Sequence, residues 1–121
     1  MILKNQLYKI ENKQVDGDSA NYVVGLNSDC FIYKAHFPNN PITPGVCIVQ
    51  TARELLEDIV GRPLEITEAK DVKFLNILSP NDHKQVTFSF SDIIVAADCV
   101  KAKVTVANGE TVFTTIAFTC A

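Results

Sequence analysis

The sequence lacks tryptophan, and it has no apolar run near the about 20 residues that a membrane-spanning helix needs. Positive charge is also scarce, since 11 Lys and Arg face 14 Asp and Glu and give a net charge of −3. Nucleic-acid-binding domains are usually basic, so this balance argues against a nucleic-acid partner. The first residues show no apolar segment of the kind found in signal peptides. We therefore expect a cytoplasmic chain that binds neither membrane nor nucleic acid.

Cysteine and histidine are too few and too scattered for a metal site. The four cysteines form no C-x-x-C pair, and the two histidines, His36 and His83, add no zinc-ligand spacing. We expect no structural metal. In a cytoplasmic chain the cysteines are expected to be reduced thiols packed as small apolar groups.

The length of 121 residues, with 47% hydrophobic and 21% charged residues, predicts one globular domain over 1–121. A chain of this size buries only about two thirds of its unfolded surface. Association with a further subunit would therefore stabilise it.

One long helix is predicted to begin near Thr43, with Thr43 as N-cap and Pro44 at the first helical position. Gly61 and the following Arg-Pro end it. Apolar residues recur at helical spacing at Val46, Ile48, Val49, Ala52, Leu55, Leu56, Ile59 and Val60. The polar face is assigned to Arg53, Glu54, Glu57 and Asp58.

The remaining segments read as strands over 21–26, 31–35, 70–78, 85–93, 98–107 and 110–120. The last two alternate apolar and polar residues, and Asn108-Gly109 between them predicts a type I′ hairpin turn. A long apolar helix needs extensive cover, so we predict an α+β fold in which a curved, mainly antiparallel sheet wraps around the helix.

The segment that suggests chemistry is H-F-P-N-N-P-I-T-P-G at 36–45, which holds three of the five prolines. Prolines restrict the backbone, so this loop is expected to be rigid and to hold His36 in place. The helix that follows presents N–H groups and the positive end of its dipole. A proton-transferring histidine beside such N–H groups suits chemistry next to a thioester carbonyl. The alternative for His36 is a loop histidine with local hydrogen bonds only.

The pattern H-F-P-x-x-P-x-x-P-G resembles the signature of the FabA/FabZ-type 3-hydroxyacyl-acyl-carrier-protein dehydratases, a hotdog-fold family. The resemblance is strong over 31–60 and weaker over 66–90. It implies a single hotdog domain in fatty acid biosynthesis that eliminates water from a 3-hydroxyacyl thioester. In that family a histidine removes the α-proton, and a helix carboxylic acid from the other protomer protonates the leaving hydroxyl.

Carried over residue by residue, the resemblance implies that His36 is the base. The N–H groups of Gly45 and Val46 would hold the thioester carbonyl. Tyr33 and Phe37 flank His36 and are candidates for the lining of an acyl tunnel, with ordinary core residues as the alternative. The substrate would be an acyl-carrier-protein or acyl-CoA thioester. No cofactor is implied, because the phosphopantetheine belongs to the substrate. The implied assembly is a homodimer or a higher oligomer.

The sequence departs from the family at the acid, which lies fourteen residues after the histidine and is Gln50 here. An amide can bond a hydroxyl but does not protonate it, and losing a general acid costs roughly 10²- to 10⁴-fold in rate. Three compensations are open. His36 could act alone with Gln50 orienting the hydroxyl; Glu54 could act through a water; or a homologous partner subunit could supply the carboxylate. The alternative for Glu54 is a solvated helix face.

The resulting hypothesis is a dehydratase-like protein with altered or reduced activity. The alternatives are a non-catalytic acyl-carrier-binding or partner subunit, a hotdog thioesterase, and an enoyl isomerase, which needs a base but no acid.

Three further expectations concern residues outside this motif. His83 is expected in an exposed loop, Cys47 as a packed thiol, and Arg53, Arg62, Lys70 and Lys73 either as a basic patch for an acidic carrier protein or as scattered solvated charges.

Overall fold

The computed structural model describes residues 2–35, 37 and 39–121. Across these residues it has one antiparallel sheet of six strands, in the order β1-β2-β4-β5-β6-β3, and two helices. The elements are β1 (Tyr8–Asp16), β2 (Ser19–Leu26), α1 (Phe31–Ala35), α2 (Gly45–Val60), β3 (Ile66–Phe74), β4 (Gln85–Val95), β5 (Val100–Asn108) and β6 (Thr111–Cys120).

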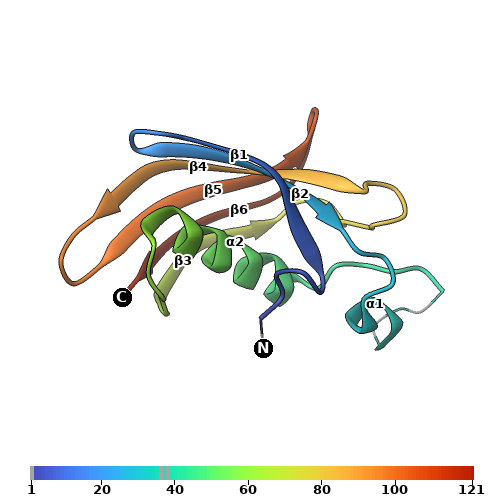
Figure 1. Cartoon of the computed structure of the whole chain (residues 1–121). Coiled ribbons are helices and arrows are strands. Elements are labelled where there is room, and N and C mark those ends of the chain that lie inside the picture. The colour runs from blue at the N-terminus through green and yellow to red at the C-terminus, as the bar shows by residue number, and fades with distance from the viewer. Residues whose placement is uncertain (1, 36, 38) are drawn as a thin grey trace.

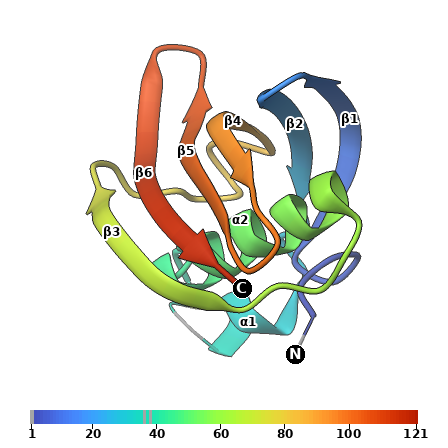
Figure 2. The ribbon, with the colours of Figure 1, turned by 90° about the vertical axis from the view of Figure 1, so that its left-hand side faces the viewer.

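The sheet curves around α2, which lies along its inner face (Figure 1). Figure 2 looks from the side and shows β3 at one edge of the sheet and β1 at the other, with α2 between them. This confirms the predicted α+β fold, a long helix wrapped by a curved antiparallel sheet. Within the described residues, no helix combines the length and the hydropathy required to cross a bilayer.

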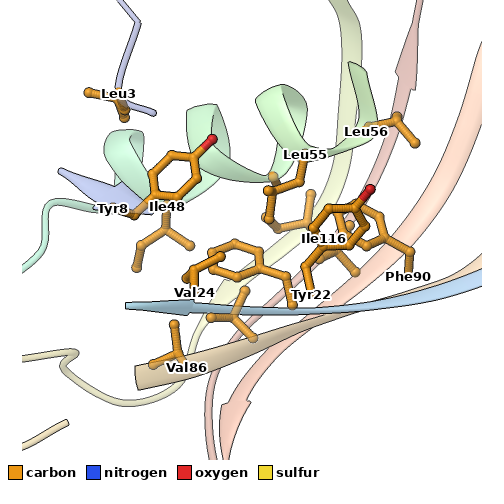
Figure 3. Close-up of a cluster of buried hydrophobic side chains, with 14 of the residues drawn as sticks. Leu3, Tyr8, Tyr22, Val24, Ile48, Leu55, Leu56, Val86, Phe90 and Ile116 are labelled. Carbon is orange, nitrogen blue, oxygen red and sulfur yellow. The ribbon is translucent and has the colours of Figure 1, made fainter. Parts of the chain in front are cut away.

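The core fills the space between the sheet and one face of α2. Ile48, Leu55 and Leu56 of the helix meet strand side chains that include Val24 and Phe90 (Figure 3). On β5 the predicted alternation is confirmed, because its inward residues are all buried, namely Val100, Ala102, Val104 and Val106.

The long helix is confirmed, and its ends show one agreement and one difference. Gly61 ends it in the left-handed region, with φ 77°, and its N–H donates to the Glu57 carbonyl. The N-cap prediction is wrong, because Pro44 is the residue before the helix and no side chain caps it. The Thr43 hydroxyl is instead buried and lies 2.8 Å from the Tyr33 hydroxyl. Pairing these two buried hydroxyl groups takes Thr43 out of its capping role.

The predicted faces of the helix are wrong at two positions. Val46, expected to be apolar core, is 74% exposed, and Glu54, expected on the polar face, is only 8% exposed. Val46 lies in the first turn, beyond the cover of the sheet. Glu54 is buried because hydrogen-bond donors from the N-terminal segment and β1 meet its carboxylate.

Two strand predictions need correction, and one strand was not predicted. Residues 31–35 form helix α1, which a turn at Asn27 introduces, since its Oδ1 accepts from the Asp29 N–H and its carbonyl from the Cys30 N–H. The strand expected over 70–78 is β3, which ends at Phe74, and the next two N–H groups bond the Phe113 carbonyl. β1 was not predicted, because it is an edge strand with mostly exposed residues and no apolar alternation.

The final hairpin is confirmed, but its turn differs from the prediction. Asn108 pairs with Thr111, so Gly109 and Glu110 form the turn. A type I′ turn needs positive φ at both central residues, and here only Gly109 has one, at 57°. The Asn108 amide donates to the Gln85 carbonyl over 2.7 Å, which keeps Asn108 in the strand.

Candidate active site

The N-terminus of α2 presents two backbone donors. The N–H groups of Cys47 and Ile48 both bond the Pro44 carbonyl, over 2.9 and 3.2 Å. Those of Gly45 and Val46 have no hydrogen-bond acceptor among the described residues. They are the two donors that the sequence predicts for a thioester carbonyl, and they lie at the positive end of the helix dipole.

Phe74 lies against this end of the helix. A Cβ added to Gly45 would come within 2.7 Å of Cζ of the Phe74 ring, so the ring occupies the space that a side chain at Gly45 would need. The ring is half-exposed, and a hollow of about 410 Å³ beside it is lined by Gly45, Ile48 and the segment 74–78. Gly45, which carries one of the two N–H groups, therefore borders a hollow that is lined largely by apolar side chains.

Gln50 lies one to two turns further along α2 and is bonded to Glu54. Nε2 of Gln50 donates to Oε2 of Glu54 over 2.9 Å. The same oxygen accepts from the Leu3 N–H over 2.8 Å, while Oε1 accepts from the Lys4 N–H and the Tyr8 hydroxyl, each over 2.9 Å. The carboxylate thus receives two donors on each oxygen.

These contacts define the electrostatics around Glu54. An ionised carboxylate only accepts hydrogen bonds, and so it can accept from all four of these donors. Burial, followed by the nearby charge of Glu54, raises the pKa of Tyr8 far above its usual value, so that hydroxyl keeps its proton and remains a donor. The solvated helix face expected for Glu54 is therefore wrong. Four donors already meet the carboxylate, and a relay from Glu54 through a water stays a prediction.

Two further predicted site residues, Tyr33 and Phe37, precede the long helix in the chain. Tyr33 is buried in α1, and burial raises its pKa to about 12. Phe37 is 60% exposed and has a φ of 57°, a rare conformation for a bulky residue. Tyr33 meets Thr43, which lines the hollow beside Gly45, and the predicted roles of Tyr33 and Phe37 as tunnel walls stay predictions. His36 lies outside the described residues, as does Pro38, so its role as base stays a prediction.

The remaining expectations concern Cys47, His83 and the predicted basic patch. Burial raises the pKa of the Cys47 thiol, which agrees with a packed, protonated group. His83 lies in its predicted loop but is half-buried, and its ring packs edge-on against Phe113 at 4.9 Å. Of the four cations named for a basic patch, Arg53 pairs with Glu57 and Lys70 pairs with Glu68, so these two have acidic neighbours, and the patch stays a prediction.

Sequence reasoning missed two contributors, Phe74 and Tyr8. No pattern in the sequence singles out Phe74, because its contact with Gly45 arises from the packing of β3 beside α2. Tyr8 reaches Glu54 from β1, a strand without a clear pattern. The sequence did contain one signal for the Gln50–Glu54 contact. The two residues are four positions apart, which places both on one side of a helix.

The six-stranded antiparallel sheet wrapped around one long helix is a hotdog-type fold. A family model described as ApeI-like, ApeI dehydratase, matches residues 12–113, and the chain belongs to this ApeI-like dehydratase family. The predicted relation to hotdog-fold dehydratases is confirmed at this level.

Two solved structures share the fold at low sequence identity. A chain of the dehydratase heterocomplex ApeI:P from Xenorhabdus doucetiae is 14% identical, with a TM-score of 0.69 over 94% of this chain and 97% of that one. An uncharacterised protein from Erwinia carotovora subsp. atroseptica is 16% identical, with a TM-score of 0.60 over 94% of both chains. No curated protein sequence gave a significant match.

Proposed function

We propose that the chain acts on 3-hydroxyacyl thioesters carried on a phosphopantetheine arm, in the cytoplasm, as a dehydratase-like subunit whose own helix lacks the acid. One observation carries this proposal. In a member of a dehydratase family, the helix that presents two N–H donors also holds an amide, Gln50, bonded to Glu54, at the position where the resemblance to FabA/FabZ-type dehydratases implies a carboxyl group.

The proposed chemistry assigns each group one task. His36 takes the α-proton, and the N–H groups of Gly45 and Val46 stabilise the negative charge that develops on the thioester oxygen. Gln50 orients the 3-hydroxyl. The C–O bond then breaks as the C=C bond forms, and the hydroxyl leaves as water with the proton that His36 carried. Without a separate acid, this last step is expected to be slow.

A second candidate is a partner role in a hetero-oligomer. The fold is shared with a chain of a complex described as a dehydratase heterocomplex. Near the site the chain exposes large apolar side chains, among them Val46, Phe74 and Ile77, beside the edge strand β3. A homologous partner with an intact carboxylate would cover these groups and complete a site. A homodimer would cover the same groups without supplying an acid.

The decisive experiment measures the hydration and dehydration of a short enoyl and 3-hydroxyacyl carrier-protein pair at the enoyl absorbance. We expect low native activity, its loss in His36→Ala, and a gain of about 10²-fold or more in Gln50→Glu. Gln85→Glu is the matched control, because Gln85 also donates to a glutamate, Glu11, but on the exposed surface. Substantial native activity that Gln50→Glu leaves unchanged would contradict the proposal.

The alternatives are separated by two further measurements. Co-expression with a homolog that carries both His and Glu is expected to yield a mixed complex if the partner role holds, with activity above that of either subunit. Release of free thiol from an acyl-CoA, without loss of water from a hydroxyacyl substrate, would instead indicate a thioesterase. Migration of an enoyl double bond that needs His36 alone would indicate an isomerase.

A further inference from the structure

Glu54 is a buried carboxylate that the proposed reaction does not use directly. We infer that it is a positioning residue, which fixes the amide of Gln50 in one of its two orientations and so decides what position 50 presents to the substrate. The inference rests on the proposed function only in assuming that Gln50 meets a substrate. The orientation of the Gln50 amide does not depend on the proposed function.

The chemistry of the two groups decides which end of the amide faces Glu54. A carboxylate oxygen only accepts, and of the two ends of an amide only Nε2 donates. At 2.9 Å between Nε2 and Oε2, the pair is a charge-assisted hydrogen bond between side chains four residues apart on α2. The carbonyl oxygen of Gln50 is therefore turned away from Glu54, and a flipped amide would set two acceptors against each other.

Glu54 can impose this orientation because it is itself held from another side. Leu3 and Lys4 each donate a backbone N–H, and Tyr8 donates its hydroxyl, at 2.8 to 2.9 Å. The Tyr8 hydroxyl points toward the helix in Figure 3, across from Leu3. These donors come from the N-terminal segment and β1, outside α2. A carboxylate fixed by three external donors gives the amide little freedom to rotate.

The closeness of Gln50 and Glu54 should raise the pKa of a carboxyl introduced at position 50. Such a carboxyl would lie about 3 Å from Glu54, and two carboxylates at that distance cannot both ionise readily. The pair would then retain a proton at a pH where an isolated glutamate has lost it. The charged or titratable side chains that line the hollow beside Glu54 are Lys4, Tyr8, Arg53, Glu57, Asp58 and Arg62.

The first test follows the side-chain NH₂ signals of Gln50 and Gln85 by ¹⁵N NMR in the native chain, assigned with Gln50→Ala and Gln85→Ala. Both amides donate to a glutamate, but only Gln50 meets a buried one. We expect hydrogen exchange at Gln50 to be at least tenfold slower than at Gln85, and this protection to be lost in Glu54→Gln. Equal exchange in the native chain overturns the inference.

The second test keeps Glu54 and so does not depend on the stability of its variant. In Gln50→Glu, ¹³C NMR of the carboxyl at position 50 is expected to give a pKa about one unit or more above that of an isolated, exposed glutamate. In the double variant Gln50→Glu/Glu54→Gln the difference is expected to disappear. A normal pKa in the single variant overturns the inference. Neither readout needs turnover, so an inactive protein would count against the proposed function alone.

Discussion

Two polar side chains that are buried in this molecule differ in how well they are bonded. Glu54 receives four hydrogen bonds. The Thr114 hydroxyl, fully buried on β6, has no hydrogen-bond partner among the described residues. Burial without a partner costs free energy that a bonded group does not lose. The bonded carboxylate of Glu54 is therefore expected to support the folded state, and the unbonded hydroxyl of Thr114 to lower its stability.

Replacement of Thr114 by valine is expected to stabilise the fold by about 1 kcal/mol, because the side chain keeps its shape and the unbonded hydroxyl is removed. Urea unfolding followed by circular dichroism measures the change. Thr51→Val is the control, since that buried hydroxyl donates to the Cys47 carbonyl over 2.8 Å and its removal should not stabilise. A loss of stability in Thr114→Val would show that the hydroxyl has a role that the packing does not reveal.

For single residues, the sequence predicts the order and spacing of side chains within one helix or strand, but not their contacts with other elements. Gly45, Val46 and Gln50 could be placed in order along a helix, because spacing alone fixes that order. The burial of Glu54 could not be predicted, since it depends on backbone N–H groups of Leu3 and Lys4, which are about 50 positions away and carry no side-chain signal.

Elements were predictable where periodicity and end signals agreed. α2 has both, with an apolar stripe and a terminal glycine, and the β5–β6 hairpin has clean alternation around Gly109. α1 was mistaken for a strand because Phe, Ile and Tyr favour strands, while the turn at Asn27 that starts the helix is a weaker local signal. β1 was missed because an edge strand needs no apolar face.

The contact between α2 and the end of β3 leads to a prediction at the scale of elements. Gly45→Ala places a Cβ 2.7 Å from the Phe74 ring, so the ring must move. In a Phe74→Ala background the clash is gone, and alanine should be neutral or stabilising by up to about 1 kcal/mol, as expected in a helix. A double-mutant cycle in urea should give a coupling of about 1 kcal/mol. Additive effects would show that the two elements do not meet at this point.

For the whole molecule, the tyrosines connect the strands and α1 to the long helix and to the segment before it. All three are at least 98% buried, and the chain has no tryptophan. Tyr8 bonds Glu54, Tyr22 bonds Asp58 over 2.5 Å, and Tyr33 lies 2.8 Å from the Thr43 hydroxyl. The two carboxylates, one turn apart on α2, thereby link the helix to β1 and β2 at one side of the sheet.

This arrangement predicts how the molecule responds to alkaline pH. Burial is the largest cause of a raised pKa for each tyrosine, to about 12 for Tyr33, and hydrogen bonds to Asp58 and Glu54 add to the rise for Tyr22 and Tyr8. The folded chain therefore keeps protons that the unfolded chain loses above about pH 10. The corresponding stability is complete below pH 10 and is lost as the pH rises, by up to about 1.4 kcal/mol per tyrosine per pH unit.

With three such tyrosines the loss approaches about 6 kcal/mol by about pH 11.5, which is comparable to the whole stability of a small domain. We expect tyrosinate absorbance at 295 nm, free of tryptophan, to stay flat through pH 10 and then to rise in one step together with the loss of circular dichroism. In denaturant the same tyrosines should titrate near pH 10. An absorbance rise near pH 10 with the fold intact would mean that at least one tyrosine is open to solvent, and the hydrogen bond of that tyrosine would then not hold in solution.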